Sequence, residues 1–310
     1  MNKLPLKLDA PDGHTVSGSL FSPFHPRAVM VISHGMAEHA GRYTGFAEWL
    51  CHHSIAVVTF DHRGHGPTCA PDQLGHYSDQ NGWHNVVEDL HQVIRYARDQ
   101  YPAKPLILFG HSMGSFIAQS CVQRHGESVD TLILSATNRI HRPELLASRF
   151  LIGLIRLFRG RCHCSATITR MTFGKFNKHF RPNRTDCDWL SRAPEQVDKY
   201  LADPLCGFEC TTELWHDFVE GMLSINPALW RKDLPVHLFA GTKDPVGEMG
   251  QGIRRHFQAI REAGVETVTL RLFEGGRHET LNETNSEDVW QYILKCMPAG
   301  IRYSAASVPD

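Results

Sequence analysis

Short apolar runs that alternate with longer amphipathic stretches constrain the fold of this chain more than any other feature. Five runs are apolar almost throughout, as expected for parallel strands that are covered on both faces. They cover residues 28–33, 55–60, 105–109, 131–135 and 236–240, and a sixth strand is expected at 267–273. Helical patterns are expected at about 43–53, 85–100, 112–125, 250–263 and 286–297. This alternation predicts an α/β fold with a doubly wound, mostly parallel sheet.

Two breaks in the alternation define the expected domain organisation. Residues 4–8 and 16–21 alternate in polarity around Asp12-Gly13, which predicts an antiparallel hairpin at the sheet edge. Residues 138–227 carry helical patterns without buried strands between them, so they are expected to form one helical cap (lid) inserted after the sixth core strand. The core is then expected at 1–137 and 228–300, followed by a frayed C-terminal tail at 301–310.

Composition excludes several kinds of partner and location. The 33 acidic and 32 basic residues give a net charge of −1, whereas a nucleic-acid-binding protein needs a basic face. Nine cysteines, an odd number, favour reduced thiols in a cytoplasmic protein over a disulfide framework. The first residues predict no signal peptide, and there is no run of about 18 apolar residues that would span a membrane.

The sequence GHSMG at 110–114 directly follows a predicted buried strand and opens a predicted helix. This is the strand–turn–helix context of the nucleophile elbow, whose glycines leave room for a tight, strained turn. Ser112 is therefore the candidate nucleophile, at the carboxyl edge of the sheet and near the positive end of a helix. The alternative is a chance match in a glycine-rich turn, and the flanking strand and helix argue against it.

The loop after strand 28–33 is the expected source of a second oxyanion donor, because nucleophile-elbow enzymes take one backbone N–H from this position. Gly35 lets the backbone turn toward Ser112, and the N–H groups of Met36 and Met113 are assigned as the two donors. An ordinary glycine turn is the alternative explanation of this loop when it is considered alone.

A serine nucleophile needs a histidine base and a carboxylate that orients the histidine. In nucleophile-elbow enzymes these groups follow in the order Ser, Asp or Glu, His, each in a loop beyond a strand end. Asp244 follows strand 236–240 and His278 follows strand 267–273, so both are expected at the same sheet edge as Ser112. Asp233 is a rival of Asp244, but it precedes its strand and is expected at the opposite edge.

Five motifs in combination resemble the monoglyceride lipase and bacterial lysophospholipase branch of the α/β hydrolases, a group of serine-aminopeptidase-like hydrolases. They are HGMAEHAGRY at 34–43, DHRGHG at 61–66, GHSMG at 110–114, GTKDPV at 241–246 and GGRHETLNE at 275–283. The resemblance extends over about 28–283, and residues 176–192 and 197–208 of the expected cap are similar to the bacterial members. One departure lies at Gly66-Pro67-Thr68, where many relatives have a small polar residue and a serine after the glycine.

The resemblance implies an α/β-hydrolase fold with an eight-stranded sheet, an inserted helical lid, no cofactor and a single-chain lipid ester as substrate. In monoglyceride lipases, polar residues of the first motif and of the elbow shape the glycerol end of the pocket. The substrate-binding set predicted on this basis is Gly35, Glu38, Arg42, Tyr43 and His111. For Glu38 and Arg42 the alternative is an ion pair between residues one helical turn apart.

The expected cap contains an apolar helix and most of the cysteines. Residues 145–158 predict a helix that places Arg149 and Arg156 on one face. Either its apolar side covers the active site, or the helix contacts an anionic membrane, and the two roles are compatible. Cys162-His163-Cys164 and the pair Cys206 and Cys210 do not match the spacing of zinc knuckles, so free thiols and no metal are expected.

The favoured hypothesis is a serine carboxylic-ester hydrolase that acts on monoacylglycerol or lysophospholipid through an acyl-enzyme, in the cytoplasm or at the inner face of the membrane. The second is a hydrolase of thioesters, small aryl esters or peptide N-termini. The third is a non-catalytic binding protein. The presence of Ser112, Asp244 and His278 at all expected strand ends argues against the third, because a binding protein needs no activated nucleophile.

Overall fold

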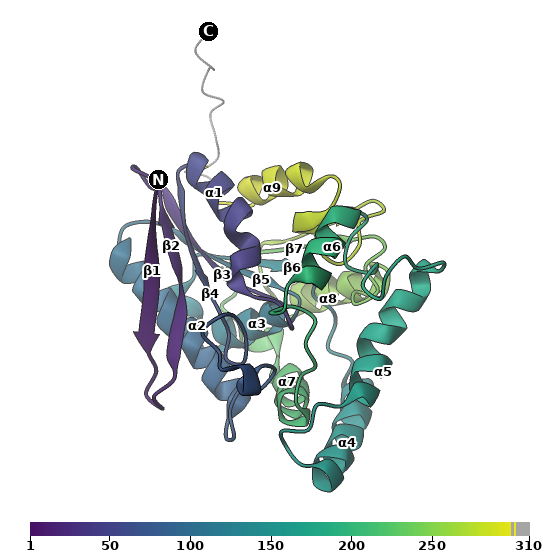
Figure 1. Cartoon of the computed structure of the whole chain (residues 1–310). Helices are drawn as coiled ribbons and strands as arrows, with labels where there is room; N and C mark the ends of the chain where they lie inside the picture. Colours follow the sequence, from purple (N-terminus) through teal and green to yellow (C-terminus); the bar gives the residue numbers. More distant parts are fainter. Residues whose placement is uncertain (299–300, 302–310) are drawn as a thin grey trace.

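Eight strands form one sheet in the computed structural model, which describes residues 1–298 and 301 (Figure 1). They are Asn2–Asp9 (β1), Thr15–Ser22 (β2), Ala28–Ser33 (β3), Ile55–Phe60 (β4), Leu106–His111 (β5), Thr131–Ser135 (β6), Val236–Gly241 (β7) and Val268–Phe273 (β8). Their order is β1-β2-β4-β3-β5-β6-β7-β8. The pairs from β4 to β8 are parallel, and β1 and β2 form the antiparallel edge. The predicted α/β-hydrolase fold is confirmed.

Helices follow most strands, as the alternating pattern predicts. The α-helices of the described residues are Thr44–His52 (α1), Gly82–Gln100 (α2), Met113–His125 (α3), Arg142–Arg159 (α4), Ala166–Asn177 (α5), Pro194–Ala202 (α6), Thr212–Ser224 (α7), Gln251–Glu262 (α8) and Ser286–Lys295 (α9). Short 3₁₀ turns are Ala40–Tyr43 (η1), Pro71–Gln73 (η2), Gly126–Ser128 (η3), Lys178–Phe180 (η4), Pro227–Leu229 (η5) and Thr280–Asn282 (η6).

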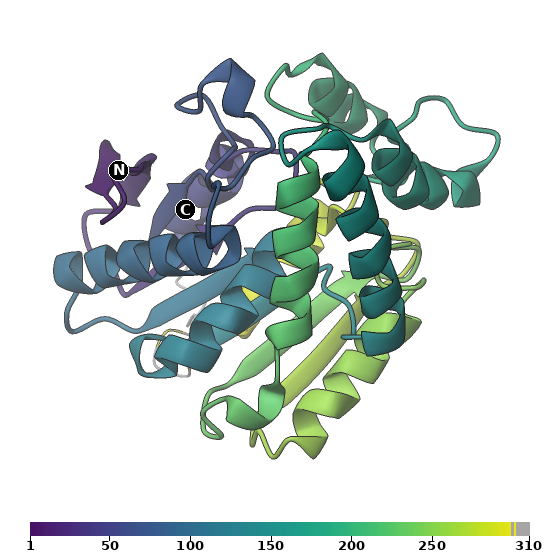
Figure 2. The ribbon, with the colours of Figure 1, turned by 90° about the horizontal axis from the view of Figure 1, so that it is seen from below.

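The sheet is covered on both faces, which explains why its central strands are apolar throughout. Helices α1 and α9 pack on one face, and α2, α3 and α8 pack on the other (Figures 1 and 2). Side chains alternate between the two layers: Met30 and Ile32 of β3 join the first, whereas Val29 and Val31 join the second. Strands β3 to β7 are buried along their whole length.

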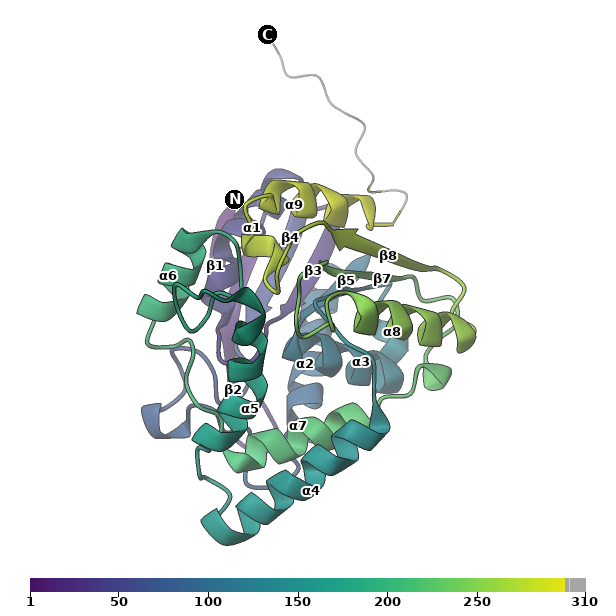
Figure 3. The same cartoon turned by 90° about the vertical axis from the view of Figure 1, so that its right-hand side faces the viewer.

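The chain between β6 and β7, residues 138–227, adds no strand to the sheet and carries α4 to α7 instead. We call this segment the cap. Helices α4 and α7 run side by side (Figure 3), and α7 also packs on α2 and α3 of the core.

The C-terminal end of the described chain packs against the core. Ile301 is buried in the layer of α1 and α9, whereas residues 302–310 of the predicted tail lie outside the described residues. Among the described residues, no helix combines the length and the apolar composition needed to cross a bilayer.

Candidate active site

The backbone of Ser112 has the strained conformation that the elbow motif predicts. Its φ of 50° and ψ of −121° place a non-glycine residue in a sparsely populated region between β5 and α3. Two glycines make the turn tight enough. A Cβ on Gly110 would lie 2.6 Å from the carbonyl oxygen of Gly114, and a Cβ on Gly114 would overlap the carbonyl oxygens of Ser33 and His34. The turn therefore holds the Ser112 hydroxyl beyond the end of β5.

Loops after β7 and β8 bring two further predicted residues to this hydroxyl. The Nε2 atom of His278 lies 2.9 Å from Ser112 Oγ, and its Nδ1 atom lies 2.9 Å from Asp244 Oδ1. Asp244 is fully buried, and the same oxygen accepts the N–H of Val246 at 2.9 Å. The structure thus joins Ser112, His278 and Asp244 in one hydrogen-bonded relay, whereas the rival Asp233 pairs with Arg231 before β7.

The surroundings of His278 favour its protonated form. Burial lowers the pKa of His278, but the charge of Asp244 and its hydrogen bond, with the charges of Glu279 and Glu38, outweigh burial and raise the pKa above its ordinary value. An imidazole with this environment can accept the serine proton and is stabilised once it is charged.

The loop after β3 lies directly against the elbow. A Cβ on Gly35 would lie 2.8 Å from Glu38 Oε1 and 3.2 Å from His111 Cδ2, so glycine permits this close approach, and its position lies next to the Cβ of Ser112. The imidazole of His34 contacts the Gly35 carbonyl through Nδ1 at 2.7 Å, while its Nε2 accepts the N–H of His62. Nδ1 therefore carries the proton and donates to Gly35. Because C=O and N–H of a trans peptide point in opposite directions, this bond turns the N–H of Met36 away from His34.

Met36 and Met113 are the predicted oxyanion donors. Met113 is the first residue of α3, where a helical N–H has no partner within its own helix. Neither amide donates a hydrogen bond to another of the described residues. Both amides are therefore available to a ligand next to Ser112.

Three of the predicted substrate-binding side chains are bonded to one another. Arg42 donates to Glu38 Oε2 at 2.7 Å, and the hydroxyl of Tyr43 donates to Glu38 Oε1 at 2.7 Å. The ion pair considered as an alternative for Glu38 and Arg42 is present. Arg42 also binds both carboxylate oxygens of Glu279, at 2.6 and 2.7 Å. The sequence reasoning assigned no role to Glu279, although it lies in the last of the five motifs.

A cavity of about 500 Å³ opens over Ser112 and His278. Its roof comes from α5 and from the cap segment after it. It combines Ala166, Phe173, Trp189, Leu190 and Tyr200 with the polar and charged side chains of Thr169, Arg170, Asn177, Lys178, Arg181, Asn183, Asp186 and Glu209. The Trp189 ring lies 5.0 Å from the ring of His278 and stacks on Phe173 at 5.7 Å. This aromatic roof was not predicted, because no short motif links residues so far apart in the chain.

Helix α4 does not line this cavity, so the expectation that its apolar side covers the active site is wrong. Two of its arginines bind α7: Arg149 pairs with Glu220, and Arg156 pairs with Glu213. The opposite side is apolar and exposed to solvent. It carries Leu146, Phe150, Leu151, Leu154, Leu157 and Phe158, of which Phe158 is 80% exposed.

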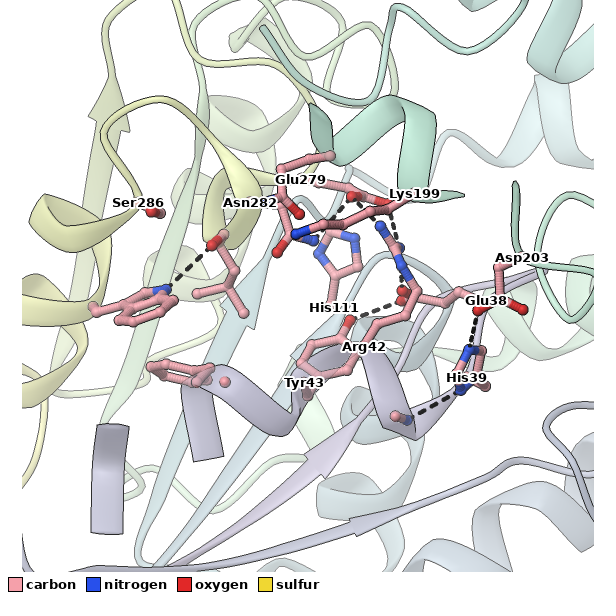
Figure 4. A pocket seen from close by; sticks show the side chains of 16 residues that line it. Glu38, His39, Arg42, Tyr43, His111, Lys199, Asp203, Glu279, Asn282 and Ser286 are labelled. Carbon is pink, nitrogen blue, oxygen red and sulfur yellow. Dashed lines mark hydrogen bonds and ion pairs between the residues drawn. The ribbon is translucent and has the colours of Figure 1, made fainter. Parts of the chain in front are cut away.

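A second cavity, of about 570 Å³, lies behind the wall formed by Glu38, His111 and Glu279, which line both cavities (Figure 4). Polar side chains, Lys199 among them, surround it together with Phe46 and Trp290. Burial, then the neighbouring His278, lower the pKa of His111 to about 4. His111 therefore adds a neutral, polar edge to the common wall at neutral pH.

Sulfur and potential metal ligands stand apart from the relay. No disulfide joins any of the nine cysteines, all of which lie among the described residues. Three groups of side chains there have ligand atoms within 4.8 Å of one another, and one of them combines Cys162 with His76 and Asp79. In another, His39 Nδ1 accepts the N–H of Gly41, so its proton lies on Nε2 and points at Asp203. That imidazole acts as a hydrogen-bond donor.

The sheet topology, with an elbow and relay at the carboxyl ends of its parallel strands, defines the chain as an α/β hydrolase. Within this class its family is also clear. Residues 24–285 match the model of the serine aminopeptidase S33 family (Hydrolase_4), so the chain belongs to that family.

Individual relatives agree with the predicted resemblance. The chain is 27% identical to the monoglyceride lipase of Rattus norvegicus over 258 residues, which cover 82% of this chain and 76% of the relative. It is 26% identical to the monoacylglycerol lipase of Mycolicibacterium smegmatis over 281 residues, or 87% and 89% of the two chains. A carboxyl esterase from Bacillus coagulans, solved with glycerol, superposes with a TM-score of 0.85 at 25% identity and covers 94% of this chain and 98% of its own.

Proposed function

We propose that this chain hydrolyses the ester bond of single-chain lipids, either monoacylglycerol or lysophospholipid. The observation that carries the proposal is the relay of Ser112, His278 and Asp244 at the floor of a cavity that the cap roofs with aromatic side chains. Within a roof that also carries charged side chains such as Arg170 and Lys178, the aromatic rings of the cap offer apolar contact to an acyl chain. Two relatives named as monoglyceride or monoacylglycerol lipases support this substrate class.

The proposed reaction follows the geometry of the relay. Ser112 Oγ attacks the acyl carbon while His278 Nε2 takes its proton, and Asp244 holds the imidazole in the required tautomer. The N–H groups of Met36 and Met113 stabilise the negative charge on the carbonyl oxygen. His278 then gives the proton to the leaving alcohol. Water repeats the two steps on the acyl-enzyme and releases the fatty acid.

The alcohol half of the substrate is proposed to lie on the side of the common wall. Glu38 and His111 present polar edges to the catalytic cavity there, as the family resemblance implies. Tyr43 and Arg42 bind Glu38 from the side of the second cavity, and Arg42 is held by its two carboxylates. No cofactor or metal takes part in this scheme.

The exposed apolar side of α4 is proposed to contact the lipid surface that supplies the substrate. It forms a stripe with side chains one turn apart, and it belongs to the same cap as the roof of the cavity. The protein would then be cytoplasmic and would contact the inner face of the membrane, as the sequence predicts.

Fatty-acid release from monoacylglycerol, lysophosphatidylcholine, a short-chain aryl ester and a peptide amide tests the proposal. We expect release from one of the two lipids to exceed that from the other substrates. Ser112→Ala should lower ester turnover by on the order of 10⁶-fold and abolish labelling by a fluorophosphonate. Turnover that survives this substitution would refute the assignment of the nucleophile. Preference for the aryl ester or peptide would favour the second hypothesis instead.

A further inference from the structure

Glu279, the residue after the candidate base, is buried, and both of its carboxylate oxygens accept hydrogen bonds. It is 5% exposed, and its two carboxylate oxygens accept a forked pair of hydrogen bonds from Arg42. Asn282 donates to the same carboxylate at 3.0 Å. The Arg42 guanidinium also lies 4.9 Å from the Tyr200 ring. A planar guanidinium held in this way has little freedom to move.

The hydrogen bonds of Arg42 also extend to the loop after β3, which we call the oxyanion loop because it carries Met36. Glu38 binds Arg42 through Oε2, while its Oε1 accepts the N–H of Gly35 at 2.6 Å. Gly35 directly precedes Met36, the assigned donor. An uninterrupted chain of short hydrogen bonds therefore runs from the loop of His278 through Glu279, Arg42 and Glu38 to the loop that bears Met36.

These two loops come from opposite parts of the sequence, and the reaction requires both at one carbonyl group. The base must reach the serine proton and the donor must reach the developing oxyanion. The Gly35 backbone also lies close to His111 and Ser112, and both of these contact His278.

The network also has an unbalanced charge. Two carboxylates share one guanidinium, so the buried group carries a net charge of −1. Asp244, Glu279 and Glu38 act on His278 with negative charge, and His111 lies beside it. Across the same cavity the cap presents Arg170, Lys178, Arg181, Asp186, Cys187 and Glu209. Negative charge at this position favours the imidazolium that forms when His278 takes the serine proton.

We propose that Glu279 is a positioning residue for ester hydrolysis: through Arg42 and Glu38 it holds the oxyanion loop in register with His278, and its charge stabilises the protonated base. The proposal rests on the function proposed above. Arg42 and Glu38 then have two roles: they align the catalytic groups, and they shape the part of the cavity that receives the alcohol half of the substrate.

The variant Glu279→Gln keeps the side-chain shape and removes the charge. We expect kcat for a short aryl ester to fall by on the order of 10²-fold with little change in KM, because misplaced catalytic groups affect the reaction more than binding. Without this negative charge the pKa of His278 is lower, so the acid limb of kcat/KM should move to lower pH. Arg42→Lys keeps the charge but loses the fork, so kcat should fall while the acid limb stays in place.

Asp89→Asn is the matched control. Asp89 forms an equally buried ion pair with Arg63, at 2.6 Å, away from both cavities. The variant Asp89→Asn should lower the melting temperature without changing kcat or the acid limb of kcat/KM. The proposal is overturned if Glu279→Gln behaves like Asp89→Asn in both kinetic readouts. If Glu279→Gln does not fold, Arg42→Lys with unchanged kcat overturns it. Ester hydrolysis that does not depend on Ser112 would instead refute the proposed function.

Discussion

Two buried imidazoles at the active site, with ring centres 5.0 Å apart, are tuned in opposite directions. Burial and the neighbouring His278 disfavour the charged form of His111 and lower its pKa to about 4. His278 is equally buried, but Asp244, Glu279 and Glu38 raise its pKa. Proton transfer is therefore assigned to His278, while His111 remains neutral over the whole range in which the relay works.

Asp244→Asn tests this division at the scale of the residue. The neutral form of His278 is the active base, so kcat/KM should fall as pH drops through its pKa, which lies above the ordinary value for histidine in the native chain. Removing the Asp244 charge lowers that pKa and moves the acid limb to lower pH. Loss of the correct tautomer should also reduce kcat by on the order of 10³–10⁴-fold. A pH–rate profile of both proteins measures the two effects, and an unmoved acid limb would contradict the argument.

At the scale of the element, strand–turn–helix geometry determines where the nucleophile stands. The elbow has no room for a side chain at Gly114, because α3 begins in contact with the end of β3. Helix α4 offers a comparison, since Gly153 has no atom within 4 Å of the position of a Cβ. The same substitution should therefore have opposite consequences in the two helices.

Gly114→Ala should destabilise the chain by at least about 1–3 kcal/mol, because β3 or α3 must move to admit the methyl group. Gly153→Ala should stabilise it by up to about 1 kcal/mol, because alanine is the better helix former. Chemical denaturation of the two variants and the native chain measures the difference. Equal stabilities for the two variants would show that the elbow tolerates a side chain.

Local patterns predicted the elements and the relay well, because both depend on residues close in sequence to strand ends. The bounds of β3, β4 and β6 agree with the apolar runs, and the elbow extends β5 to His111. Trp189 and Glu279 were missed for the opposite reason. Their roles depend on partners about 90 and 237 residues away, His278 and Arg42, and no pattern within one segment records such contacts. The orientation of α4 was mispredicted because its arginines pair with α7 across the cap.

At the scale of the whole molecule, the cap gives one side to the substrate cavity and another to solvent. Helix α5 and Trp189 face the relay, whereas the apolar stripe of α4 faces outward. Monomeric proteins rarely expose so many large apolar side chains in one stripe without a partner. The proposed lipid contact accounts for this exposure.

The triple variant Phe150→Ser, Leu157→Ser and Phe158→Ser tests the contact. Partition into phosphatidylcholine–phosphatidylglycerol vesicles should fall by on the order of 10²-fold, since each side chain loses roughly 1 kcal/mol of apolar transfer. Turnover of a short soluble ester should stay unchanged. Leu229→Ser, at a side chain 63% exposed outside α4, is the control and should leave partition unaltered. Unchanged partition of the triple variant, measured by co-sedimentation, would rule out this surface.

The cap is also bonded to the loop after β3. The carbonyl of Ala37, the residue after Met36, accepts hydrogen bonds from Tyr200 Oη at 3.0 Å and from the N–H of Gly207 at 2.9 Å. Outward displacement of this part of the cap would break both bonds and release the peptide next to Met36, the proposed oxyanion donor. If substrate enters by such a displacement, entry and ester cleavage would occur one after the other. The bonds to Ala37 would have to form again before each cleavage.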